Sequence, residues 1–332
     1  MTDTRQVLLD ELRQRRTELN LPPLLKRDFQ PASGVEAITD SSSPGPVLRV
    51  MQWNLLAQAL STGDDNFVLC PSEALAWDHR KLHILEEILT YDATVVCLEE
   101  VDHFSYIRDN LAKVGYEGCF FPKPDSPCLY TPENYGPDGC AMFWKSAEVE
   151  CISEDDINLC VASGEETNQV AILCELKYKT SQKAFFVAVT HLKSKKPYWE
   201  LRHEQGKYLE NRLLRQAKDS PLMVCGDFNA EPTEQVYATF KTSILSLSSA
   251  YCHLSSEMQE PEYTTWKVRG GSHGRQTEDA HCIDYMFYTQ EHLQPVSLLK
   301  MPTGDEIGEK RLPSFAYPSD HLSLVVDFVF KD

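Results

Sequence analysis

The sequence predicts an α/β sandwich, in which two packed and mainly antiparallel sheets are flanked by helices. Many short apolar segments have the composition of strands, and several of them follow one another with no helix between. A few longer segments have the apolar spacing of amphipathic helices. A doubly wound parallel sheet would need a crossover helix between successive strands, so this order of segments favours stacked sheets with helices outside.

Strands are expected where a short run of β-branched, aromatic and other apolar residues is bounded by turn-forming residues. They are predicted at residues 47–55, 94–98, 139–145, 149–153, 169–178, 184–192, 221–225, 282–288, 294–300 and 321–330. Helices are expected where apolar residues recur three or four positions apart, as Leu82, Leu85 and Leu89 do. They are predicted at residues 78–90, 103–113, 198–217 and 233–242. We expect these elements to form one domain over residues 46–332, because no linker interrupts them.

The first 45 residues are expected to form a flexible or helical extension of this domain. Leu8, Leu9 and Leu12 would lie on one side of a helix over residues 5–19. The segment Asp40-Ser-Ser-Ser-Pro-Gly-Pro46 has the composition of a linker.

The formal net charge of −18 restricts the classes of partner. A long polyanion such as RNA would be repelled overall, and proteins that bind nucleic acid usually carry a basic face. A small phosphorylated substrate stays open, because a local cationic pocket or a metal ion could hold it. We therefore expect a monomer that acts on a small molecule, with nucleic acid disfavoured as the main substrate.

The cysteines and the apolar runs indicate a reducing compartment. The eleven cysteines form no CxxC pair and mostly lie in apolar segments, which favours buried thiols over disulfides or a zinc site. No apolar run reaches the ~18 residues of a membrane span. Residues 1–6 lack the hydrophobic core of a signal peptide. A cytoplasmic location is expected, with a mitochondrial one if a longer isoform supplies a targeting segment.

The strand predicted at residues 221–225 is followed by two polar residues, Asp227 and Asn229. Residues two apart at a strand end point the same way, so a carboxylate and an amide would project together. The carboxylate can orient a water or hold a hard cation, and the amide can donate to a phosphoryl oxygen. Alternatively, both residues only form a turn that caps the helix predicted at residues 233–242.

Polar residues also lie at or near the ends of other predicted strands, where strand ends that converge can form a cleft. They are Asn54, Glu100, His191, Asp284, Asp320 and His321. Each alone has an ordinary explanation as a solvated strand end, a turn residue or a core histidine. Together their carboxylate and amide oxygens suit Mg²⁺ better than Zn²⁺, with Mn²⁺ as a substitute. A cation and an imidazolium held by a carboxylate would neutralise a phosphoryl group under attack, so the set predicts metal-assisted hydrolysis of a phosphate ester.

Seven motifs, in this order along the chain, resemble those of the endonuclease/exonuclease/phosphatase family. They are Met51-Gln-Trp-Asn-Leu-Leu-Ala, Cys97-Leu-Glu-Glu-Val, Gly136-Pro-Asp-Gly-Cys, Thr190-His-Leu-Lys, Cys225-Gly-Asp-Phe-Asn, Ile283-Asp-Tyr and Tyr317-Pro-Ser-Asp-His. The resemblance runs from residue 47 to the C-terminus. It implies a four-layer α/β sandwich and a hydrolytic catalytic domain at residues 46–332.

The resemblance implies that Glu100 is the principal metal ligand and that Asn54 and Asp320 contribute to the metal site. The chain departs from the family next to this ligand, because relatives usually carry Gln where Glu99 stands. Strand alternation predicts that Glu99 points away from the metal. If Glu99 does approach the site, its charge would raise the pKa of a neighbouring carboxylate.

The resemblance also implies the roles of the catalytic residues. Asp227 would orient the attacking water, and Asn229 would hold the scissile phosphate. Asp284 and His321 would form the carboxylate–imidazole pair, and His191 would stabilise the transition state.

Further segments resemble one branch of the family, among them Phe120-Phe-Pro-Lys-Pro and Tyr263-Thr-Thr-Trp-Lys. This implies a phosphatase that removes the 2′-phosphate of NADP⁺ and NADPH. Lys193 and Lys195 follow His191, and with Lys123 and Asn229 they are candidates for substrate binding, although a lysine run is more often a solvated loop. The family usually has Arg at the position of Lys195, and Lys keeps the charge without the planar fork. No glycine-rich dinucleotide fingerprint is present, so the dinucleotide would bind as a substrate.

Two alternatives remain at this stage. A 3′-exoribonuclease acting on poly(A) would need an aromatic platform for successive bases, and Tyr198 and Trp199 could supply it or belong to a helix core. A catalytically inactive adaptor of mRNA-decay complexes would be expected to have lost metal or acid–base residues. Every expected position is filled here.

Overall fold

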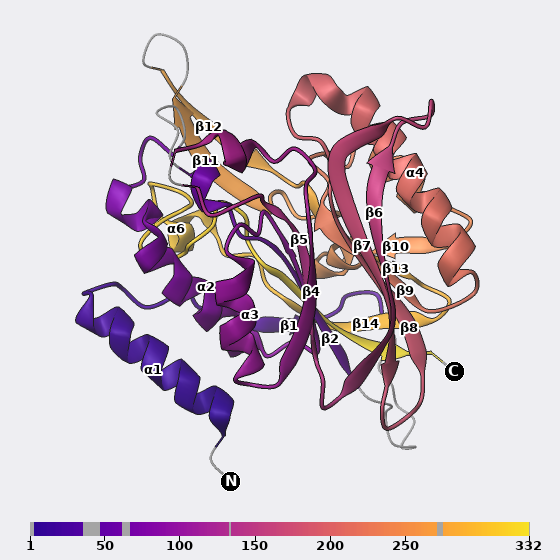
Figure 1. The fold of residues 1–332 in the computed structure, drawn as a ribbon, viewed down its shortest axis with the longest axis horizontal. Coiled ribbons are helices and arrows are strands. Elements are labelled where there is room, and N and C mark those ends of the chain that lie inside the picture. Colours follow the sequence, from indigo (N-terminus) through magenta and orange to yellow (C-terminus); the bar gives the residue numbers. More distant parts are fainter. Residues whose placement is uncertain (1–2, 36–46, 62–66, 133, 271–274, 332) are drawn as a thin grey trace.

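The computed structural model describes residues 3–35, 47–61, 67–132, 134–270 and 275–331. Two packed sheets lie between helices (Figure 1), which confirms the predicted fold class. The first sheet has the order β1 (Phe29–Pro31), β14 (Leu293–Leu299), β15 (Leu324–Phe330), β2 (Leu48–Asn54), β3 (Val95–Glu99), β5 (Gly139–Lys145) and β4 (Tyr116–Pro122). The second has the order β10 (Leu247–Ser249), β13 (Asp284–Thr289), β9 (Leu222–Asp227), β8 (Ala184–His191), β7 (Glu166–Tyr178) and β6 (Val149–Cys160). Both sheets are mainly antiparallel, with β2 parallel to β3 and β8 parallel to β9.

The helices cover the outer faces of the two sheets. Helices α1 (Thr4–Glu18), α2 (Trp77–Tyr91) and α3 (Phe104–Ala112) lie on the side of the first sheet, and α4 (Trp199–Ala217) lies on the side of the second (Figure 1). Helix α5 (Gln235–Lys241) packs beside α4. A separate hairpin of β11 (Thr265–Gly270) and β12 (Gln276–His281) lies near α6 (Gly304–Ile307). No helix of the described residues is long and apolar enough to cross a bilayer.

Both faces of the central strands are buried, so alternate residues enter different cores. On β3, Val96 and Leu98 face α2 and α3, whereas Val95 and Cys97 face the second sheet. The residues of β9 divide in the same way between the inter-sheet core and the core under α4. This alternation decides which side chains reach the end of the inter-sheet layer.

The N-terminal segment packs against this domain. Leu8, Leu9 and Leu12 of α1 are buried in the core that α2 shares, and β1 pairs with β14 at the sheet edge. Arg27 is buried with its Nη2 2.6 Å from Glu87 Oε1, and its Nη1 donates to the carbonyl of Ser323 over 2.9 Å. The helix expected over residues 5–19 is therefore present. The linker predicted at residues 40–46 lies outside the described residues, and the domain boundary there stays a prediction.

Every strand and helix predicted after residue 46 is present, and most have ends shifted by a few residues, whereas β5 has the predicted ends. The prediction for residues 149–153 was too short, because β6 continues to Cys160, and the last strand begins at Leu324 rather than 321. Sequence patterns missed β1, β4, β10, α6 and the β11–β12 hairpin.

The Arg27–Glu87 pair gives a test of how far the N-terminal segment supports the fold. Arg27→Ala should lower the free energy of unfolding by about 3–5 kcal/mol, because it leaves the Glu87 carboxylate buried without its cation. Urea unfolding would measure the change. Lys26→Ala is the matched control, since the Lys26 side chain is 88% exposed and that of Arg27 only 1%. Equal effects of the two substitutions would contradict the structural role of this pair.

Candidate active site

The predicted catalytic residues lie at one end of the inter-sheet core. Asn54, His191 and Asp227 continue the side-chain alternation that places Val50, Val189 and Cys225 between the sheets. Strand β9 lies so close to β8 at Gly226 that an added Cβ there would stand 2.1 Å from the carbonyl oxygen of Thr190. Polar groups therefore stand where the apolar layer between the sheets ends.

A cleft with a volume of about 300 Å³ opens at this end. Its charged and polar lining includes Glu100, Lys123, His191, Lys193, Lys195, Asp227, Asn229, Lys267, Arg269, Asp320 and His321. Asn54 and Asp284 do not line the cleft themselves, but each contacts a residue that does. All of the residues predicted for the site are thus brought together.

Asp284 and His321 form the predicted carboxylate–imidazole pair. His321 Nδ1 lies 2.9 Å from Asp284 Oδ2, and this oxygen also accepts from the Thr264 hydroxyl over 2.6 Å. Burial alone would lower the pKa of His321, but Asp284, Asp320 and Asp227 outweigh it and raise the pKa to about 9. At neutral pH His321 is therefore an imidazolium.

Asp227 is held by donors on both of its oxygens. Oδ1 accepts from the backbone N–H of Asn229 over 2.8 Å, and Oδ2 accepts from Asn54 Nδ2 over 3.0 Å. Burial, and then the charge of Asp284, raises the pKa of Asp227 to about 7. Asn229 has a left-handed backbone with φ of +50°, which the alternation argument does not foresee. A carboxylate with this pKa can accept a proton from water near neutral pH.

His191 lies between two N–H donors. Its Nδ1 is 3.4 Å from Lys123 Nζ, and its Nε2 is 3.0 Å from Asn229 Nδ2. Burial, and then the charge of Lys123, keeps the pKa of His191 well below its ordinary value. The ring is therefore neutral. Lys123 itself is only 7% exposed, and its Nζ lies 2.6 Å from Asp138 Oδ2.

Glu100 and Glu99 point to different places, as predicted. Glu100 has a left-handed φ of +53° and lines the cleft, where its Oε2 accepts from the Ala57 N–H over 3.1 Å. Glu99 is fully buried behind the cleft, and its Oε2 accepts from Gln52 Nε2 over 2.8 Å. Burial, and then the charge of Asp284, raises the pKa of Glu99 well above its ordinary value. Burial therefore favours the uncharged form of Glu99, which is closer to the Gln of the family at this position.

The cleft contains a carboxylate that can hold a cation. One neighbouring donor contacts each Glu100 oxygen, which leaves lone pairs open to the cleft for a hard cation that keeps its waters. Asn54 turns its amide nitrogen towards Glu100 and Asp227, and its oxygen accepts from the Leu56 N–H. In this orientation Asn54 positions the two carboxylates, and its role as a metal ligand stays a prediction.

Asp320 makes an ion pair that the sequence argument missed. Its Oδ2 accepts from Lys267 Nζ, and the charge of Lys267 outweighs burial and lowers the pKa of Asp320 to about 2. Its contribution to a metal site stays a prediction as well. Lys267 and Arg269 are two apart on β11, so both reach the same side of the hairpin. The sequence signal for this cationic side was the alternation of apolar and basic residues in Trp266-Lys-Val-Arg269.

The lysine loop after His191 is fixed by a buried arginine. Arg202 of α4 donates from Nη1 to the carbonyl oxygens of Lys193 and Lys195, over 3.0 and 2.8 Å. Lys195 adopts a left-handed φ of +76°, and both lysines line the cleft. Lys196 does not belong to the lining. Lys193 and Lys195 of this loop are therefore directed at the cleft, whereas Lys196 lies outside its lining.

A second arginine connects the loops that carry Asn54 and Asp320. Arg80 of α2 is 1% exposed, and its Nε donates to the carbonyl of Pro318 over 2.6 Å. Its Nη2 donates to the carbonyls of Leu55 and Leu56. These hydrogen bonds fix the loop after β2 and the loop before β15 relative to each other beside the cleft.

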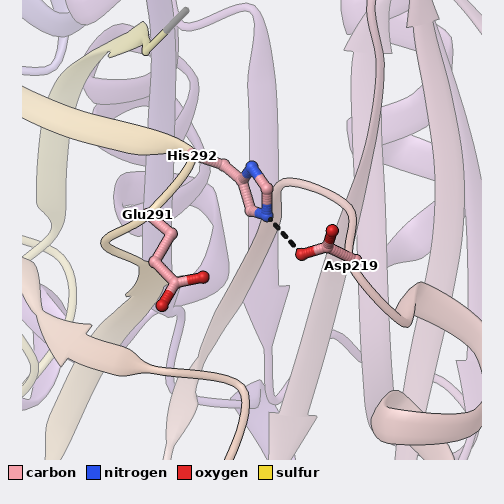
Figure 2. A group of neighbouring side chains, drawn as sticks. All are labelled: Asp219, Glu291 and His292. Carbon is pink, nitrogen blue, oxygen red and sulfur yellow. Dashed lines mark hydrogen bonds and ion pairs between the residues drawn. The ribbon is translucent and has the colours of Figure 1, made fainter.

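A second acidic group lies far from the cleft. Asp219 and His292 meet at 3.1 Å beside Glu291 (Figure 2). Asp219 precedes β9, whereas Asp227 ends it, so the group stands at the opposite end of that strand. Asp219 is 92% exposed, and an exposed acidic cluster alone is no site.

Comparisons with known proteins agree with this geometry. The chain is 50% identical over 315 residues to nocturnin of Rattus norvegicus, which covers 94% of the chain and 71% of that protein. It matches the structure of the human nocturnin catalytic domain with a bound sulfate anion at a TM-score of 0.77 and 42% identity, covering 93% of the chain and 100% of that domain. The CCR4-Not complex 3′-5′-exoribonuclease subunit Ccr4 of Neurospora crassa is 23% identical, over 86% of the chain and 46% of that protein.

Most of the chain matches one protein family. A model of the Endonuclease/Exonuclease/phosphatase family matches residues 51–321, a span that contains every residue placed in or beside the cleft. The chain therefore belongs to the Endonuclease/Exonuclease/phosphatase family, and it is a hydrolase of the phosphatase or nuclease type.

Proposed function

We propose that the enzyme removes the 2′-phosphate of NADP⁺ and NADPH, with Mg²⁺ as cofactor. The observation that carries this proposal is the concentration of cations around a small cleft in a chain of net charge −18. Lys193, Lys195, Lys267 and Arg269 line about 300 Å³ together with the acid–base residues. This arrangement fits one terminal phosphate better than the extended backbone of a polynucleotide. The chain is 50% identical to rat nocturnin, which agrees with the branch of the family that its sequence motifs resemble.

Each residue of the cleft has a separate role in the proposed hydrolysis. Asp227, with its pKa near neutrality, takes a proton from the attacking water, and Asn229 holds a phosphoryl oxygen. His321, protonated and oriented by Asp284, stabilises the negative charge that develops on phosphorus oxygens. Glu100 would hold Mg²⁺, which when bound would polarise the phosphoryl group.

A 3′-exoribonuclease acting on poly(A) is the second candidate, because the structure leaves two aromatic side chains exposed. Tyr198 and Trp199 are 44% and 42% exposed at the start of α4, so they are not core residues. Lys193 Nζ lies 5.0 Å from the Tyr198 ring centre. These rings could stack with bases of RNA, or with one ring of a dinucleotide. An inactive adaptor is disfavoured, because every catalytic position is filled and the groups contact one another.

Lys123 acts on the ring of His191 through its charge. Its ammonium lies 3.4 Å from Nδ1, and this charge opposes protonation of the ring. A neutral imidazole accepts at one nitrogen only, and the Asn229 amide nitrogen lies 3.0 Å from Nε2. Lys123 would then act on the substrate mainly through His191.

Lys123→Met should raise the pKa of His191 towards its ordinary value, because it removes a cation that opposes protonation of the ring. Imidazole ¹⁵N shifts measured against pH would show the change. Lys196→Met is the control, since Lys196 does not line the cleft. An unchanged His191 titration in Lys123→Met would refute this role.

Phosphate release from NADPH in Mg²⁺ should be abolished by Glu100→Gln and by chelation of the metal, because both remove the cation from the cleft. Glu99→Gln should leave the rate nearly unchanged, since this side chain does not line the cleft and burial favours its uncharged form. Shortening of a poly(A) oligonucleotide, measured in parallel, separates the two enzymes. RNA shortening without release from NADPH would replace the phosphatase proposal with the exoribonuclease.

Lys195→Ala should raise the KM for NADPH about tenfold and leave kcat nearly unchanged, because a charge-assisted hydrogen bond to a phosphate contributes about 1.5–3 kcal/mol. Lys196→Ala, one residue further on, should change neither constant. Steady-state kinetics of both variants would measure the difference. The same KM for both variants would place the Lys195 side chain away from the substrate.

A further inference from the structure

Three cysteines meet between the two sheets, away from the catalytic residues. Cys119 lies on β4 of the first sheet, and Cys174 lies on β7 of the second. Their sulfur atoms are 3.9 Å apart within the inter-sheet core. Cys151 lies on the neighbouring strand β6, where it pairs with Leu176, two residues from Cys174, and it packs against the same core. The three thiols therefore lie on neighbouring strands within one layer, from one sheet to the other.

One of these thiols reaches the surface. Cys151 is partly exposed, whereas Cys119 and Cys174 are buried. The neighbouring Cys174 thiol lowers the pKa of Cys151, and the thiolate is the nucleophilic form of cysteine. Cys70, another partly exposed cysteine, behaves in the opposite way, because burial raises its pKa to about 11.

We propose that Cys151, Cys174 and Cys119 form an oxidation site for hydroperoxides, in which Cys151 reacts first and the oxidation is passed inward to a disulfide between the sheets. The cysteine pattern of the sequence predicts a reducing compartment, and all eleven cysteines are free thiols in the structure. Disulfides that form in such compartments are usually transient or regulatory. The proposal rests on the thiol cluster and does not depend on the identity of the substrate.

The chemistry balances with the hydroperoxide as the two-electron oxidant. The Cys151 thiolate attacks a peroxide oxygen, so that an S–O bond forms, the O–O bond breaks and an alcohol or water leaves. The Cys174 sulfur then attacks the Cys151 sulfur, which forms an S–S bond and releases water with the thiol proton. Attack of Cys119 on Cys174 moves the disulfide to the Cys119–Cys174 pair and returns Cys151 as a thiolate.

The position of this cross-link connects the cluster to the cleft. Cys119 lies on β4, which leads directly into Lys123, and Cys174 lies on β7, whose first half carries Gln169. Lys123 and Gln169 both line the cleft. A disulfide between these strands would pull the two sheets together four residues from Lys123 and five residues from Gln169 along the chain. If the proposed phosphatase activity holds, oxidation should lower it reversibly.

Mass-spectrometric mapping after exposure of the full-length enzyme to hydrogen peroxide would test the proposal. The expected products are disulfide peptides that join Cys174 to Cys151 or to Cys119. Cys151→Ser should slow the loss of the Cys174 and Cys119 thiols about tenfold, because the entry thiolate is missing. Its partly exposed position makes this variant easier to tolerate than a change at buried Cys174. Cys70→Ser is the matched control and should oxidise like the parent.

Two outcomes would overturn the proposal. One is a Cys151 that oxidises no faster than Cys70, and the other is a Cys151 that becomes sulfinic acid while Cys174 and Cys119 stay reduced. Phosphate release from NADPH, followed before and after reduction with dithiothreitol, reports separately on catalysis. Disulfide formation in an enzyme that never releases phosphate would leave the thiol site standing and remove the proposed substrate.

Discussion

The arrangement of the site depends on the compensation of carboxylates buried at the end of a dry core. Asp227 and Asp284 continue the inter-sheet layer and are each 1% exposed, so water solvates their charges poorly. The imidazolium of His321 contacts Asp284 directly and lies 3.9 Å from Asp227 Oδ2. Burial raises the pKa of Asp227 most, and the repulsion from Asp284 that this shared cation leaves in place adds to the shift, so that the pKa is about 7. The electrostatic cost of burying these carboxylates therefore raises the proton affinity of Asp227, which allows it to act as a base.

The same need for compensation explains how an acidic protein can select a phosphate. Lys267 and Lys123 are almost fully buried, and each makes an ion pair with a carboxylate, Asp320 or Asp138. These cations are therefore partly neutralised, whereas Lys193 and Lys195 carry no such partner of opposite charge beside their ammonium groups among the described residues. The attraction for a phosphate then comes from a few groups at one place, and the overall charge repels the rest of a long polyanion.

The sequence was sufficient where one local pattern decides the structure. Apolar strands placed Asn54, His191 and Asp227 correctly at strand ends. Glu99 and Glu100 do point to different places, but Glu99 shares the face of Cys97, and the turn after β3 directs Glu100 into the cleft. Alternation could not foresee the left-handed backbone of Glu100 and Asn229, because the turns that impose it depend on neighbouring strands. Strand β4 escaped prediction because Glu117 and Gly118 interrupt its apolar pattern. The hairpin with Lys267 and Arg269 has a largely polar second strand, so only its packing beside the cleft reveals it.

Support for the site reaches well beyond the residues that touch a substrate. Arg80 joins the loops of Asn54 and Asp320, and Arg27 joins the N-terminal segment to Ser323, two residues after His321. Both arginines are buried and donate to backbone carbonyls, which fixes loops that make few regular hydrogen bonds. A displacement of one strand in the inter-sheet core is then transmitted to neighbouring strands, because the core is closely packed. A disulfide between β4 and β7 would act on this core directly, and the cleft is the part of the core that opens to solvent.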